Sequence, residues 1–208
     1  MEFYENSQSP ERALLIGVDT GEYNAEISME ELALLSETAG AEIIGTVIQK
    51  LEAPSPATYI GSGRMSEVAA FCRNNDIDLI IADSELTPSQ INNIETKTDT
   101  RVVDRTMLIL DIFAARARSS EGKLQVELAQ LKYSLPFLSG RGKSMSRLGG
   151  GIGTRGPGES KLESDKRHIR RRIHSLSEEL KRVEKRRDLI RSRRKKDGVI
   201  TVAIVGYT

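Results

Sequence analysis

A glycine-rich stretch with flanking arginines, RLGGGIGTRGPGESKLE at residues 147–163, holds the side chains best suited to contacting phosphate. Glycines let the backbone approach a surface closely, and arginines donate charge-assisted hydrogen bonds to phosphate oxygens. The candidate contact residues in and around this stretch are Arg141, Lys143, Arg147, Gly149, Gly150, Gly151, Gly153, Arg155, Gly156, Gly158 and Lys161. The chemistry that they predict is noncovalent binding of a polyanion.

Two spacings in this region match nucleotide-binding loops, but neither has the context that such a loop requires. Residues 151–156 fit G-x-G-x-x-G, yet the preceding SGRGKSMSRL is polar and turn-like, whereas a dinucleotide loop follows a strand. Residues 142–144 read GKS, the end of a P-loop, but Phe137 stands where its first glycine would be. The remaining interpretations are a flexible linker and an RNA-contacting tip. The density of arginine and lysine favours the tip.

The charge is distributed unevenly along a chain of 208 residues with a net charge of +1. Residues 1–140 contain 11 Lys and Arg and 22 Asp and Glu, so their net charge is 11 − 22 = −11. Residues 141–208 contain 20 and 8, so their net charge is 20 − 8 = +12. This asymmetry favours nucleic acid as the partner of the basic half. The alternative is that one half of the chain neutralises the other.

Other functional classes find little support in the sequence. The single cysteine, Cys72, excludes a disulfide framework, and its apolar neighbours predict a buried thiol. His168 and His174 are isolated from other metal-ligand residues. No nucleophile–base pair emerges, and Asp104 is expected to cap a helix. The N-terminus lacks a signal-peptide pattern, and no apolar run is long enough to span a membrane, so we expect a cytoplasmic protein.

The first hundred residues predict the elements of an α/β domain, residues 1–105. Apolar runs at 13–18, 41–49, 77–83 and 100–105 are typical of strands, and helical patterns separate them. The second of these helices is expected to place on one face Met65, Val68, Ala69 and Cys72. Ser28 with Glu31 resembles a capping box, and Thr87 before Pro88 indicates another helix start. The alternation predicts a small parallel sheet with flanking helices and right-handed crossovers.

Residues 106–196 predict a long antiparallel two-helix hairpin. One helix is expected from Thr106 to Leu138, with leucines at alternating steps of four and three, and a second from Lys161 to Lys196 with an apolar residue every seven. The glycine-rich segment 139–160 would then form an exposed tip far from the sheet domain. A monomer is expected, although the same seam would also allow a coiled-coil homodimer.

The final segment, 197–208, contains the apolar run VITVAIV followed by Gly206. We expect this run to be the first strand of a further domain, because a single apolar strand does not form a fold by itself.

Three long motifs resemble the N-terminal region of the HflX family of ribosome-associated GTPases. They are TYIGSGRMSEV at 58–68, VVDRTMLILDIFAARARSSEGKLQVELAQLKYSLPFL at 102–138 and GGGIGTRGPGESKLESDKRHIRRRI at 149–173. The resemblance implies a sheet subdomain, a helical hairpin and then a Ras-like GTPase domain. It also implies binding to the large ribosomal subunit and its rRNA, and a role in splitting or rescuing stalled ribosomes, with the 149–158 loop at the rRNA-facing tip.

The resemblance further implies GTP and Mg²⁺ as cofactors of the full-length protein. Gly206, Tyr207 and Thr208 match the opening of the family's GTP phosphate loop, whose lysine and Mg²⁺-binding Ser or Thr lie outside this chain. The chain alone is therefore not expected to hydrolyse GTP. An alternative function is that the N-terminal sheet domain binds ATP independently.

Overall fold

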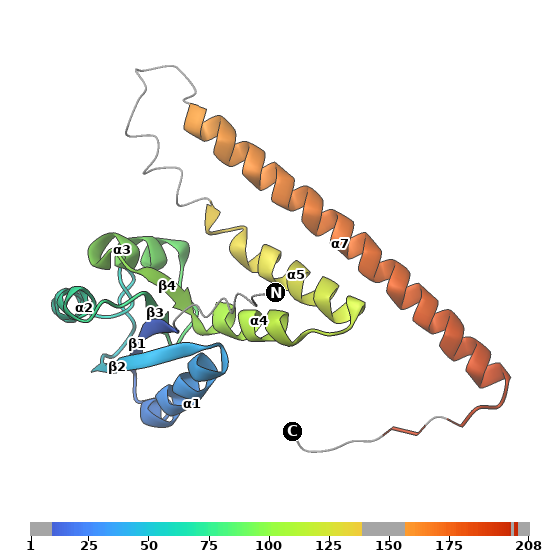
Figure 1. Cartoon of the computed structure of the whole chain (residues 1–208), viewed down its shortest axis with the longest axis horizontal. Coiled ribbons are helices and arrows are strands. Elements are labelled where there is room, and N and C mark those ends of the chain that lie inside the picture. The colour runs from blue at the N-terminus through green and yellow to red at the C-terminus, as the bar shows by residue number, and fades with distance from the viewer. Residues whose placement is uncertain (1–9, 139–156, 201, 204–208) are drawn as a thin grey trace, which may run out of the picture.

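The computed structural model describes residues 10–138, 157–200 and 202–203, with side chains described from residue 163 onward in the last helix. A sheet flanked by helices forms one part of the molecule, and helix α7 (Pro157–Lys196) extends past it (Figure 1).

Four parallel strands form the sheet, in the order β2-β1-β3-β4. They are β1 (Glu11–Asp19), β2 (Ala41–Lys50), β3 (Leu79–Ala82) and β4 (Arg101–Asp104). The central strand β1 is buried from Ala13 to Val18, as expected for a parallel strand covered on both faces. The predicted α/β class and parallel sheet are confirmed.

Helices cover the two faces of the sheet in pairs. Helices α1 (Ala25–Thr38) and α4 (Arg105–Arg116) pack on one face, where Leu32 and Leu108 join a core cluster. Helices α2 (Ser62–Asn74) and α3 (Pro88–Thr98) pack on the opposite face. The predicted apolar face of α2 is confirmed, because Met65, Val68, Ala69 and Cys72 are all buried.

Side-chain caps set the starts of these helices, and one predicted cap is wrong. The side chain of Asn24, not Ser28, caps α1, and Ser28 instead accepts a hydrogen bond from Arg105 inside the helix. Thr87 caps α3 as predicted, in a capping box with Gln90. Asp104 caps α4 as predicted by accepting from the Met107 N–H at 2.9 Å.

The first arm of the hairpin is two helices, not the single helix expected from Thr106 to Leu138. Helix α4 ends at Arg116, and α5 (Ser120–Ser134) runs back alongside it (Figure 1). The break occurs where the Ser119 hydroxyl accepts the Gly122 N–H at 3.0 Å. A serine that caps a new helix satisfies amides that a continuous helix would otherwise bond, which gives the chain a place to turn.

The second arm, α7 (Pro157–Lys196), is a single helix of 40 residues. It begins four residues before Lys161, the predicted start, because proline fits the first helical position. Beyond it, the described residues Val199, Ile200, Val202 and Ala203 have no regular secondary structure, and the rest of the run expected to form a strand lies outside the described residues. Ile200 is 86% exposed, with no neighbouring strand to supply ladder hydrogen bonds. Among the described residues, no helix has the length and apolarity that a membrane crossing requires.

Candidate nucleic-acid interface

Helices α5 and α7 pack against each other in opposite directions, and α7 carries the basic side chains of the candidate interface. Arg172 donates two hydrogen bonds to Glu127, at 2.7 and 3.0 Å, and Arg187 lies 2.5 Å from Glu121. The contact positions rise along α5 as they fall along α7, so the two helices run in opposite directions. Leu176, between the two arginines, is completely buried. The predicted antiparallel pairing is confirmed for α5 and α7.

Most cations of α7 do not take part in this pairing. The described residues include three further ion pairs made by the helix, Arg170 with Glu163 at 3.8 Å, Lys181 with Glu178 at 2.8 Å and Arg193 with Asp197 at 3.9 Å. The cations of α7 that have no carboxylate partner in the described part of the chain are Lys166, Arg167, Arg171, Arg182, Lys185, Arg186, Arg191, Arg194, Lys195 and Lys196.

The paired and unpaired cations differ in what they can offer an external anion. The hydrogen bond and charge of Glu127 raise the pKa of Arg172, and those of Glu178 raise the pKa of Lys181. These two side chains are already engaged with carboxylates. Arg171 and Arg182 donate only through Nε to backbone carbonyls, both at 3.4 Å, so their terminal nitrogens face solvent. The unpaired set can therefore form charge-assisted contacts to phosphate.

At the carboxyl edge of the sheet, by contrast, the charged side chains Asp83, Arg105 and Glu31 are paired with one another. Asp83, whose side chain is 1% exposed, accepts a hydrogen bond from Arg105 at 2.8 Å. Arg105 also pairs with Glu31 on α1. The arrangement joins β3, α1 and α4, and both terminal nitrogens of Arg105 already have partners within the protein.

Helix starts at this edge are also satisfied by side chains of the protein. The Gly61 N–H, which precedes α2, donates to Gln49 Oε1 at 2.8 Å. Thr87 and Asp104 occupy the starts of α3 and α4. A phosphate-binding edge would offer free helix N–H groups and a positive field, so this geometry does not favour the ATP-binding alternative.

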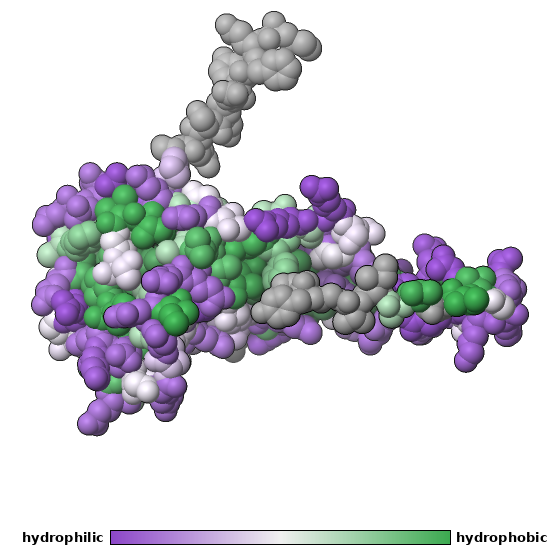
Figure 2. Space-filling view, turned by 90° about the horizontal axis from the view of Figure 1, so that it is seen from below, coloured by the Kyte–Doolittle hydropathy of each residue, from purple (hydrophilic) through white to green (hydrophobic). Residues whose placement is uncertain are grey.

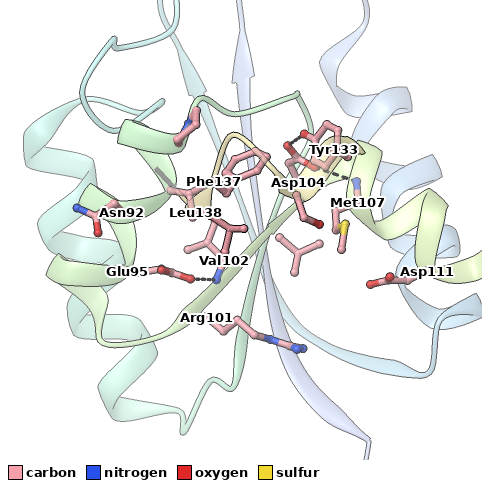
Figure 3. Close-up of a pocket in the computed structure, with 14 residues that line it drawn as sticks. Asn92, Glu95, Arg101, Val102, Asp104, Met107, Asp111, Tyr133, Phe137 and Leu138 are labelled. Atoms are coloured by element: carbon pink, nitrogen blue, oxygen red, sulfur yellow. Dashed lines mark hydrogen bonds between the residues drawn. The ribbon is translucent and has the colours of Figure 1, made fainter. Parts of the chain in front are cut away.

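A cavity of about 320 Å³ lies where the end of α5 meets strand β4 (Figure 3). Phe137 and Leu138 lie against Val102 of the edge strand, and the Tyr133 hydroxyl donates to Asp104. Leu138, the last described residue before the glycine-rich loop, therefore lies beside the sheet domain. Sequence reasoning missed Tyr133 and Phe137; the available signal was two aromatics spaced four apart, whose rings lie 5.3 Å apart.

Few of the predicted contact residues fall within the described structure. Gly158 and Lys161 lie in the first turns of α7, where only the backbone is described. The predicted RNA contacts outside the described residues are Arg141, Lys143, Arg147, Gly149, Gly150, Gly151, Gly153, Arg155 and Gly156. Gly206, Tyr207 and Thr208 also lie outside them.

Two protein-family models match consecutive segments of this chain. Residues 26–114 match the family model "GTP-binding GTPase N-terminal", and residues 116–194 match "GTP-binding GTPase Middle Region". GTPase HflX from Caldanaerobacter subterraneus is 54% identical over 98% of this chain and 47% of its own length. The chain belongs to the HflX family. Its HflX relative from Escherichia coli K12 is 40% identical over 99% of this chain and 48% of its own length.

Solved structures with the same fold include a GTP-binding protein from Sulfolobus solfataricus in complex with GDP. It is 27% identical, with a TM-score of 0.55 over 84% of this chain and 46% of that one. A complex of SsGBP with GDP is also 27% identical, with a TM-score of 0.61 over 86% of this chain and 45% of that one. The chain spans about half the length of the curated HflX relatives that it matches.

Proposed function

We propose that this chain is the ribosome-binding portion of an HflX-type GTPase. The α5–α7 hairpin and the loop that joins its arms bind rRNA of the large ribosomal subunit, and the full-length protein helps to split or rescue stalled ribosomes. GTP and Mg²⁺ bind in the full-length protein, where Gly206, Tyr207 and Thr208 open the phosphate loop. The chain acts as a cytoplasmic monomer.

The unpaired arginines of α7 are the observation that carries this proposal. Arg171, Arg182 and Arg186 are separated by 11 and 4 residues, so they share one face of the helix and extend over about 22 Å. That length allows contacts to several successive phosphates. The sheet domain is less suited to binding rRNA, because residues 10–104 contain 17 Asp and Glu but only 6 Lys and Arg.

Co-sedimentation with purified large subunits tests the proposal. The triple variant R171Q/R182Q/R186Q should bind at least about tenfold more weakly, and the slope of log affinity against log salt should fall by about 2. The matched control R64Q/R73Q/K97Q removes three exposed cations from the sheet domain and should bind as the wild type does. Equal binding by both triple variants would reject the α7 surface.

The loop is tested separately, because it lies outside the described residues. Charge reversal of Arg147 and Arg155 should weaken pelleting with large subunits at moderate salt. Equal pelleting of wild type and reversed protein would remove the loop, but not α7, from the proposed interface.

Calorimetry with ATP and with GTP separates the proposal from the ATP-binding alternative. We expect no heat with either nucleotide on this chain, since the helix starts at the sheet edge are already capped. Saturable heat with ATP, abolished by a substitution at the sheet edge, would instead support the alternative.

A further inference from the structure

Helix α1 has a second apolar stripe, on the side opposite to the one that packs on the sheet. Ala25, Met29, Leu32 and Ser36 form its buried side. On the outer side Ile27 is 62% exposed and Leu34 is 64% exposed, and Tyr23, 43% exposed, immediately precedes the N-cap residue. Ile27 and Leu34 are one heptad apart, so their side chains share a face about 10.5 Å apart along the axis. Large apolar side chains exposed together on one face of a helix indicate an interaction surface, whereas single scattered ones do not.

Carboxylates surround this stripe. Residues 13–49 include Asp19, Glu22, Glu26, Glu30, Glu31, Glu37 and Glu42, and contain no lysine or arginine. Among the described residues, only Glu31 of this set has an ion-pair partner, Arg105 on the neighbouring helix α4. Glu30 and Glu37 lie three residues beyond Ile27 and Leu34 respectively, so they flank the stripe on the same side of the helix. Figure 2 views the molecule from the side where α1 lies, and shows apolar groups set among hydrophilic ones at the sheet end.

We propose that the outer face of α1, defined by Ile27, Leu34, Glu26, Glu30 and Glu37, binds a basic amphipathic segment of another protein. The partner segment presents two apolar side chains one heptad apart, with lysines or arginines around them. Its apolar groups bury Ile27 and Leu34, and its cations meet the three glutamates. This surface is separate from the α7 surface proposed for RNA, and neither proposal depends on the other.

The charge of the surface decides between classes of partner. RNA and anionic lipid headgroups both carry phosphates, which Glu26, Glu30 and Glu37 of α1, unpaired among the described residues, would repel. A second copy of this chain offers a basic helix in α7, but the exposed apolar residues there, Leu189 and Ile190, are adjacent. Adjacent residues point about 100° apart on a helix, so α7 could present only one of them to the α1 stripe.

A fluorescent synthetic peptide tests the proposal by anisotropy. The probe is a helix of about 21 residues with leucines at heptad spacing and lysines elsewhere, and its control has the same composition in scrambled order. We expect the patterned peptide to bind the chain and I27S/L34S to weaken binding by about tenfold or more. E26Q/E30Q/E37Q should also weaken binding and reduce its dependence on salt.

A matched control comes from the part of the sheet domain away from α1. E52Q/E67Q/D76N removes the same number of exposed carboxylates and should change the affinity by less than about twofold. Since all of these side chains are exposed, each variant should keep the wild-type circular dichroism and melting temperature. Equal binding of the patterned and scrambled peptides, or equal binding of the peptide by wild type and I27S/L34S, would overturn the proposal.

Three further measurements exclude other occupants. An RNA oligonucleotide should bind wild type and I27S/L34S equally; a loss specific to I27S/L34S would mean that α1 contacts RNA. Sedimentation should show no concentration-dependent dimer that I27S/L34S dissociates, because such a dimer would make a second copy the occupant. The C-terminal half of the Caldanaerobacter relative, added in trans, should not displace the peptide; displacement would make this face an intramolecular contact.

Discussion

The Tyr133 hydroxyl donates a hydrogen bond to Asp104 Oδ2, and this contact joins the end of α5 to the end of strand β4. The same oxygen accepts from the Leu86 N–H at 3.0 Å, and Oδ1 accepts from the Met107 N–H at 2.9 Å. One buried carboxylate therefore fixes the start of α4, the loop before α3 and the position of the helical arm. This residue is therefore one of the points at which the hairpin is held on the sheet domain.

Removal of the Tyr133 hydroxyl tests this relationship. Y133F should lower the free energy of unfolding by about 1 kcal/mol, the usual net value of one hydrogen bond. D104A should cost more, about 3 kcal/mol, because the N–H groups of Leu86 and Met107 lose their acceptor as well. Urea denaturation followed by circular dichroism measures both. The double variant should be no less stable than D104A; additive losses would show that the two residues act independently.

Stability at alkaline pH should depend on the same tyrosine. Burial and the hydrogen bond to Asp104 raise the pKa of Tyr133 above its ordinary value of 10.0, and burial also raises the pKa of Tyr23 and Tyr59. The folded state thus favours the neutral phenol. The resulting stabilisation is fully present below the tyrosine pKa of the unfolded chain, and it is lost as pH rises from that value through the higher pKa of the folded state. The melting temperature should be flat between about pH 7 and 9 and fall above about 10. The melting temperature of Y133F should fall less steeply with pH than that of the wild type. An identical fall would mean that other groups cause the loss of stability at alkaline pH.

Two leucines of α7 should differ sharply in their effect on stability. Leu176 is completely buried and Leu189 is 72% exposed. L176A should lower the free energy of unfolding by about 2 to 4 kcal/mol through lost apolar contact and the cavity left behind. L189A, the matched control on the same helix, should cost less than about 0.5 kcal/mol. Chemical denaturation measures both values, and similar losses would contradict the packing of α7 through Leu176.

Cys72 should be unreactive in the folded protein. The thiol is 2% exposed, and its burial raises the pKa of the sulfhydryl, so little thiolate is present at neutral pH. Labelling with a thiol reagent should be at least about a hundredfold slower in the native protein than in urea. A similar rate in both conditions would show that α2 opens readily from the sheet.

The α/β part of the molecule was largely predictable because its signals are local. Apolar runs and helical periodicity indicated each strand and helix in order, and the buried face of α2 followed from the spacing of Met65, Val68 and Cys72. Thr87 and Asp104 were identifiable as caps for the same reason, since a cap bonds to an amide only three residues away. The true cap of α1, Asn24, was missed because Ser28 offered a similar local pattern.

By itself, then, the sequence determined the elements of the α/β part, their order, the parallel sheet and the separation of an acidic half from a basic half, all of which depend on residue type and short spacing. Only the tertiary structure decided how distant parts meet. Helix α5 packs back along α4, Tyr133 reaches Asp104, and Arg105 joins Asp83 to Glu31. These contacts depend on which faces are buried together once the chain is compact, and no periodicity along the chain encodes that choice.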